Sequence, residues 1–203
     1  MNLTVDFETR SFIDIKKSGA WRYAEDASTE VMCLAIRVDT GVPFIWIPDY
    51  FAKVAGIPYL LNGRIALGHV EDLVLKAVTL EAHNAEFERA IWSNKMVPLG
   101  LPEIPIERWR CSAAKAAACS LPRSLDGAVK ALGLPEKYQK DMEGHRIMMR
   151  LCKPKKPSKN SPGIWDETPE KLIKLFKYCQ QDVIAEHTLS KEIPDLSPLE
   201  QQV

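Results

Sequence analysis

The sequence of 203 residues has no apolar run of the length, about 18 to 20 residues, that a membrane-spanning helix needs. Its first residues include no basic stretch followed by an apolar one, which excludes a secretory signal there. Cysteine is scarce, with five residues, an odd number, and no CxxC pair. These features argue against a disulfide framework and a zinc ribbon, and they favour a reducing interior. Together these absences predict a cytoplasmic protein without a membrane partner.

The sequence also has no net charge, because 27 Lys and Arg residues balance 27 Asp and Glu residues. The balance hides an asymmetry, since basic residues outnumber acidic ones between Arg108 and Lys159 and the remainder is acidic. An enzyme that binds a polyanion and holds metal ions with carboxylates needs one part of each kind. An unevenly charged, solvated surface explains the same pattern, so both readings stay open.

The order of predicted elements indicates an α/β protein with a single domain over residues 1–203. Strands are predicted at 3–8, 31–38 and 42–47, and the turn at 39–41 makes the last two a hairpin. Further on, the predicted elements are helix 70–78, strand 80–82, helix 85–96 with Asn84 as its N-cap, strand 106–111, helices 112–119, 124–133 and 141–151, a Lys- and Pro-rich loop at 153–163, and a long helix at 169–192.

Three separate segments carry the residues with chemical potential. Asp6 and Glu8 are two positions apart on the first strand and so project from one face. Glu88 falls in the first turn of the helix after Asn84. Tyr178 and Asp182 are four apart in the last helix and share a face.

Taken alone, each segment has a simpler explanation, namely a solvated acidic side chain or a partly buried tyrosine. Together, four carboxylates and a phenol from separate elements are what a pair of divalent cations requires. Mg²⁺ prefers oxygen ligands, and two such ions about 4 Å apart can clamp both oxygens of a phosphoryl displacement.

The three segments resemble the motifs of the DEDD superfamily of 3′→5′ exonucleases in its tyrosine subclass. They match D-x-E at Asp6–Glu8, N-x-x-F-acid at Asn84–Glu88 and Y-x-x-x-D at Tyr178–Asp182. One departure is Glu88, where the family usually has Asp. The resemblance implies a ribonuclease-H-like fold, in which a central mixed β-sheet is flanked by α-helices.

Longer stretches are similar to phage-type family A DNA polymerases, where such a segment is the N-terminal proofreading domain. The similar stretches are 6–11, 21–26, 82–89 and 140–154. Residues 196–203 resemble the point at which that domain passes into the polymerase, so the resemblance implies a C-terminal polymerase domain as partner and, for a phage protein, the host cytoplasm as location.

The resemblance also implies the role of each motif residue. Asp6, Glu8 and Asp182 would hold the first of two Mg²⁺ or Mn²⁺ ions, and Asp6 and Glu88 the second. Tyr178 would position the attacking water, and all five residues would be catalytic. The implied reaction is hydrolysis of DNA, as a single strand or a frayed 3′ end, to release 5′-mononucleotides in proofreading.

Substrate contacts are predicted at Thr9, Trp21, His83 and Asn84. Trp21, with Tyr23, falls in a predicted loop at 9–29 and offers a ring for an unpaired base to stack on; packing in the core is the alternative. Two other functions stay open, namely an exonuclease of the same chemistry that trims RNA ends and a non-catalytic nucleic-acid-binding module.

Overall fold

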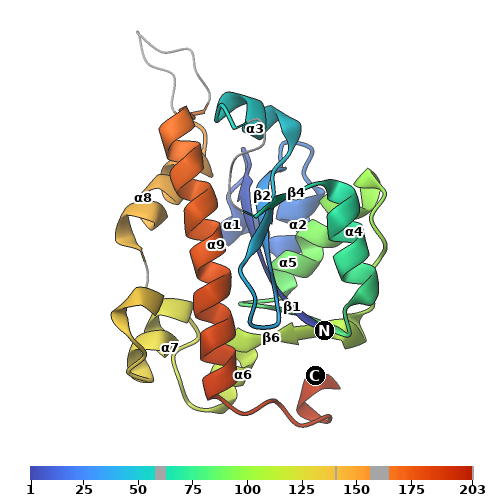
Figure 1. Cartoon of the computed structure of the whole chain (residues 1–203), viewed down its shortest axis with the longest axis vertical. Helices are drawn as coiled ribbons and strands as arrows, with labels where there is room; N and C mark the ends of the chain where they lie inside the picture. Colours follow the sequence, from blue (N-terminus) through green and yellow to red (C-terminus); the bar gives the residue numbers. More distant parts are fainter. Residues whose placement is uncertain (58–62, 140, 156–164, 203) are drawn as a thin grey trace.

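The computed structural model describes residues 1–57, 63–139, 141–155 and 165–202 of the chain. Most of the loop predicted at 153–163 therefore lies outside the described residues. In Figure 1 the long C-terminal helix runs across one side of a central sheet.

The sheet has six strands in the order β4-β3-β2-β1-β5-β6. β1 pairs with β2 antiparallel and with β5 parallel, while β6 extends the sheet parallel to β5. β3 pairs antiparallel with β2, and β4 lies parallel to β3. This mixed topology, with helices on both faces, is the ribonuclease-H-like α/β fold that the sequence predicted. The strands are β1 (Asn2–Arg10), β2 (Glu30–Val38), β3 (Phe44–Trp46), β4 (Arg64–Ile65), β5 (Thr79–Ala82) and β6 (Trp109–Cys111).

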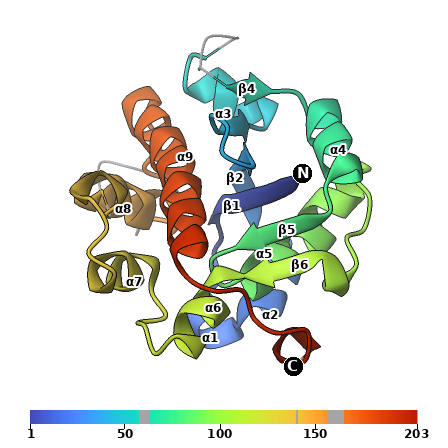
Figure 2. The same cartoon turned by 60° about the horizontal axis from the view of Figure 1, so that its bottom comes forward.

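Helices cover both faces of the sheet. Figure 2 shows α7, α8 and α9 together on one side and α4 on the other. The α-helices are α1 (Ile15–Ser18), α2 (Ala20–Glu25), α3 (Asp49–Val54), α4 (Leu67–Lys76), α5 (Glu86–Ile91), α6 (Ser112–Ala118), α7 (Leu125–Ala131), α8 (Met142–Leu151) and α9 (Pro169–Glu192). A π-helix (Trp92–Met96) continues α5, and short 3₁₀-helices are Val97–Leu99, Ile106–Arg108, Glu136–Tyr138 and Glu200–Gln202.

The central strand β1 alternates between two environments. Leu3, Val5 and Phe7 are buried in the core that the sheet forms with α2, α4 and α5. The intervening side chains therefore point to the opposite face, where α9 lies and where Thr4 meets His187 through a 3.2 Å hydrogen bond. The second core on that face joins the sheet to α3, α8 and α9. This alternation places Asp6 and Glu8 between β1 and α9.

The helix predicted at 85–96 is observed as α5 followed by a π-helix that ends at Met96, but its predicted N-cap is wrong. Asn84 is not the N-cap: it adopts a left-handed conformation with φ of 73°, and α5 starts at Glu86 without a side-chain cap. Asparagine tolerates this conformation well, so Asn84 forms part of the turn that follows β5. After Ile91 the chain continues as a π-helix, and the Asn94 amide donates to the Ala90 carbonyl at 3.0 Å. That carbonyl would otherwise accept the α-helical bond from the backbone of residue 94.

The predicted loop at 9–29 is wrong for most of its length. β1 continues to Arg10, and α1 and α2 occupy much of the remainder. The Arg10 side chain, buried at the strand end, is held by Glu30 at 2.5 Å and Glu167 at 2.6 Å. Tyr23 belongs to the core, with its hydroxyl 2.9 Å from the Thr9 hydroxyl, rather than to a loop open for stacking.

Several other bounds differ from the prediction. β3 begins only at Phe44, since Pro43 has no N–H for the ladder. Helix α4 ends at Lys76, and Val78 instead donates its backbone N–H to Met1. β6 begins at Trp109 after a 3₁₀-helix, and the short β4 was not predicted. Strands 31–38 and 80–82 and the helices at 112–119, 124–133, 141–151 and 169–192 are confirmed to within about two residues.

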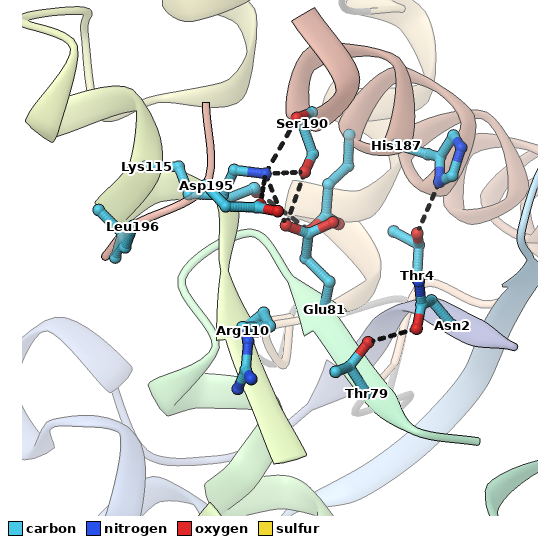
Figure 3. A network of polar contacts seen from close by, with 12 residues as sticks. Asn2, Thr4, Thr79, Glu81, Arg110, Lys115, His187, Ser190, Asp195 and Leu196 are labelled. Atoms are coloured by element: carbon cyan, nitrogen blue, oxygen red, sulfur yellow. Dashed lines mark hydrogen bonds and ion pairs between the residues drawn. The ribbon is translucent and has the colours of Figure 1, made fainter. Parts of the chain in front are cut away.

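A buried lysine links strand β5 to helix α9 and to the segment that follows this helix. Lys115 on α6, only 5% exposed, donates to the Ser190 carbonyl at 2.9 Å and pairs with Asp195 at 2.6 Å. The Ser190 hydroxyl donates to Glu81 on β5 at 2.6 Å. Figure 3 shows these groups converging. The charge of Lys115 is thereby neutralised, and α6, α9 and β5 are fixed to one another.

All five cysteines are free in the structure. In the described part of the chain, no helix combines the length and the apolar character needed to cross a membrane.

Candidate metal centre

Three carboxylates meet between β1 and α9. One oxygen from each of Asp6, Glu8 and Asp182 lies within 4.8 Å of the others. The two-residue spacing on β1 and the position of α9 against that strand bring them together. Ligand atoms at such distances can surround one cation, whose metal–oxygen bonds are about 2.0–2.6 Å long. An all-oxygen set of this kind suits Mg²⁺ or Mn²⁺.

Tyr178 lies one turn before Asp182 on the same face of α9. The side chain is buried, and burial raises its pKa, with the negative charges of Asp182 and Glu8 adding to the shift. A hydrogen bond to Asp182 acts in the same direction. The phenol therefore stays protonated throughout the physiological pH range, beside the acidic cluster.

Glu88 approaches the cluster from α5. Its side chain is 3% exposed, and its Oε2 has no hydrogen-bond partner. Oδ2 of Asp6 is buried and unpartnered in the same way. Among the described residues, neither acid forms an ion pair with a lysine or arginine. Buried carboxylate oxygens without partners are costly, and cations bind such oxygens, so the chemistry of both residues fits metal binding. Among the described residues, however, the group of mutually close ligand atoms comprises Asp6, Glu8 and Asp182 and does not include Glu88.

The acids of the cluster hold their protons unusually tightly. Burial raises the pKa of Asp6 to about 8, and the charge of Asp182 contributes to this rise. The pKa of Glu8 lies well above its ordinary value because of burial and the neighbouring Asp6, and the pKa of Glu88 is raised by the same two causes. Without cations, the ionised cluster therefore opposes folding.

This electrostatic cost predicts a stability that falls as pH rises in the metal-free protein. Between its ordinary pKa of 3.8 and its folded pKa of about 8, Asp6 is protonated to a greater extent in the folded chain than in the unfolded chain. The free energy of unfolding therefore falls as pH rises through this range. The pKa of His187 is lowered to about 4, so this residue makes stability rise with pH. Its effect is confined to the range below its ordinary pKa of 6.5 and does not reach pH 7. We therefore expect the melting temperature, measured in a chelator, to drop by several degrees between about pH 7 and about pH 9.

Two additions make this measurement specific. Mn²⁺ or Mg²⁺ should abolish the slope, because cations bind the ionised carboxylates. Asp6→Asn should reduce it, whereas Asp72→Asn, which changes an exposed acid on α4, should leave it intact. A melting temperature that rises between about pH 7 and about pH 9 would contradict the raised pKa values of the clustered acids.

The predicted substrate contacts are placed differently from one another. Thr9 is buried against Tyr23. Trp21 is 39% exposed, with the Arg89 guanidinium 6.0 Å from its ring centre. Asn84 is exposed and lines a surface cavity of about 250 Å³. Trp21 and Asn84 therefore remain accessible to a ligand.

His83 is engaged within the protein. Its Nδ1 lies 2.8 Å from the Ser112 hydroxyl, and its Nε2 lies 2.8 Å from the Arg123 carbonyl. Ser112 donates in turn to Glu186 at 3.0 Å. Both ring nitrogens thus already have partners.

Glu186 was missed by the sequence reasoning. It is 1% exposed, and its pKa is raised by burial and by the charges of nearby acids, including Glu88 and Asp6. Its position four residues after Asp182 puts it on the same face of α9, and that spacing was the available signal.

Cys179, between the two motif residues, donates to the Asp6 carbonyl at 3.4 Å and so helps to hold β1 against α9.

The chain is therefore an α/β protein of the ribonuclease-H-like fold class, with an acidic cluster between its central strand β1 and its last long helix α9. No family model matches the chain. The chain is similar to the DNA polymerase of Bacillus phage SP02, with 31% identity over 204 residues. The match covers 98% of this chain but 29% of that polymerase, so the chain spans less than a third of its relative's length.

Proposed function

We propose that this protein is a metal-dependent 3′→5′ exonuclease that hydrolyses DNA from its 3′ end and releases 5′-mononucleotides. The observation that carries the proposal is the meeting of Asp6, Glu8 and Asp182 beside Tyr178, with the buried Glu88 near enough to feel the charge of Asp6. Similarity to a phage DNA polymerase supports DNA as the substrate and proofreading, together with a polymerase region, as the role.

The carboxylates would hold two divalent cations, Mg²⁺ or Mn²⁺. Asp6, Glu8 and Asp182 would bind the first, and Asp6 would share the second with Glu88, whose longer side chain replaces the usual Asp. Bound cations supply activation of water and neutralisation of charge on the phosphodiester. The protein's own contribution is to fix this arrangement beforehand, so that little reorganisation is needed in the transition state.

Tyr178 would orient the attacking water. Burial and the neighbouring acids raise the pKa of Tyr178, so without cations the phenol is protonated at neutral pH and is a poor general base. A neutral hydroxyl beside Asp182 can still donate one hydrogen bond and accept another. Its role in the proposed reaction is therefore positioning, which is worth a large rate factor when the reacting groups are aligned.

The direct test uses a single-stranded DNA oligonucleotide labelled at one end. With a 5′ label and Mg²⁺ or Mn²⁺, we expect a ladder of products that shorten one nucleotide at a time. With a 3′ label, labelled 5′-mononucleotide should appear at once. Products of internal cleavage, or release from the 5′ end, would overturn the proposal.

An RNA oligonucleotide of the same sequence distinguishes the two exonuclease hypotheses. Faster hydrolysis of RNA than of DNA would move the function to RNA trimming, since the acidic cluster itself does not read the 2′-hydroxyl. Binding of DNA without release of nucleotide, unchanged by Mn²⁺, would instead indicate a non-catalytic module.

A further inference from the structure

The ring of Tyr178 is in unusually close contact with a glycine of the neighbouring helix. Gly144 is buried in the first turn of α8. A methyl group on Gly144 would lie 2.5 Å from Cδ2 of Tyr178 and 3.0 Å from its Cβ. Carbon atoms that are not bonded do not approach to 2.5 Å, so any side chain here must displace the tyrosine or the helix.

Helix α8 has little freedom to move away. Leu151 is buried against α9 in the second core, and Ile147 and Met148 pack on the same core. Glu143, next to Gly144, forms an ion pair with Lys174 of α9. Because close-packed cores resist rigid shifts, the ring of Tyr178 is the part that would give way.

The other end of the same ring reaches the acidic cluster. The hydroxyl interacts with Asp182, and the charges of Glu8 and Asp6 act on it as well. We infer that Gly144 is a positioning residue: by allowing α8 to approach the Tyr178 ring, it sets where the hydroxyl stands relative to the carboxylates. This inference rests on the proposed exonuclease function for its kinetic consequence, but the contact itself does not.

Helix α7 offers a matched control. Gly127 also sits three residues after an N-cap, and a methyl group there would lie 2.7 Å from the Ser124 hydroxyl and 2.8 Å from Cβ of Pro122. At Gly144 the N-cap Asp141 lies similarly, with Oδ2 at 2.8 Å. Gly127→Ala therefore reproduces the crowding of a cap and an overpacked helix without touching Tyr178.

The first experiment is a kinetic double-mutant cycle on a single-stranded DNA oligonucleotide with Mg²⁺. We expect Gly144→Ala to lower kcat about tenfold to a hundredfold, as displacements of about 1 Å can, with KM changed less than about twofold. In a Tyr178→Phe background, where no hydroxyl remains to be displaced, Gly144→Ala should lower kcat less than about twofold. Gly127→Ala should keep kcat near wild type.

The second experiment tests the contact without any activity. Gly144→Ala should lower the melting temperature clearly more in the otherwise wild-type chain than in the Tyr178→Ala variant, where Asp141 and the Cβ of residue 178 still crowd the methyl group but the ring does not. This comparison still holds if the single variant is poorly folded.

The outcomes separate the two claims. Equal kcat losses from Gly144→Ala in both backgrounds, or a wild-type kcat in the single variant, would overturn the positioning role. Equal melting-temperature losses with and without the ring would overturn the contact. A wild-type protein that releases no nucleotide would instead refute the exonuclease function and leave the thermal cycle to judge the contact.

Discussion

Replacing Asp6 by asparagine is expected to abolish nucleotide release, with kcat at least about a thousandfold below wild type. Asp6 is the carboxylate that both proposed ions would share, and it lies with Glu8 and Asp182 in the cluster. Asparagine keeps the size of the side chain but removes its charge, so neither ion would be held in place. Quench-flow or gel measurement of single-nucleotide release under saturating DNA gives kcat directly.

The same substitution should make the metal-free protein more stable at pH 8. Burial and like charge hold the pKa of Asp6 at about 8, so removal of the acid relieves repulsion in the cluster. Loss of activity with a higher melting temperature separates a damaged site from a damaged fold. Asp72→Asn, on the exposed surface of α4, should change neither quantity. Residual activity above about a tenth of wild type would show that Asp6 is not a shared ligand.

Replacing Tyr178 by phenylalanine is expected to lower kcat about a hundredfold while KM for DNA changes little. The ring stays in place against Gly144, and only the hydroxyl that would orient water is lost. Because burial and Asp182 keep the phenol protonated, the shape of the pH–rate profile should be unchanged. A general base would instead remove one limb of that profile when replaced.

Tyr138→Phe provides the comparison for this variant. Tyr138 lies in a 3₁₀-helix with the Lys137 ammonium 4.8 Å from its ring centre. Loss of its hydroxyl should leave kcat near wild type. A hundredfold loss in Tyr178→Phe together with a shifted pH optimum would mean that the phenol takes part in proton transfer.

Local periodicity was enough to predict which side chains share a face. The spacing of two between Asp6 and Glu8 and of four between Tyr178 and Asp182 follow directly from strand and helix geometry. The resemblance to known motifs supplied the ribonuclease-H-like topology. Periodicity cannot, however, show that β1 lies against α9, because contacting residues such as Asp6 and Cys179 are 173 positions apart and their contact depends on the packing of the whole sheet.

The errors have local physical causes. Asn84 is a residue type that suits both an N-cap and a left-handed turn, and the turn after β5 selects the second. The helices at 15–18 and 20–25 are too short to show a periodic pattern, and such helices depend on tertiary contacts for their stability. Tyr23 was accordingly placed in a loop, although its ring belongs to the core.

Two features at the site left weaker signals. Glu186 continues the four-residue spacing of Tyr178 and Asp182, but a surface acid on a long helix shows the same spacing. Gly144 is a glycine inside a helix, which usually has a packing reason, but only the structure shows that the neighbour is Tyr178.

The arrangement of β1 against α9 has a consequence for biosynthesis. Translation proceeds from the N-terminus, so Asp6 and Glu8 leave the ribosome first and Asp182 emerges after some 170 further residues. A nascent or prematurely terminated chain that stops before α9 holds only part of the acidic cluster. On the proposed function, such fragments cannot degrade DNA, and nuclease activity is withheld until almost all of these 203 residues have been made.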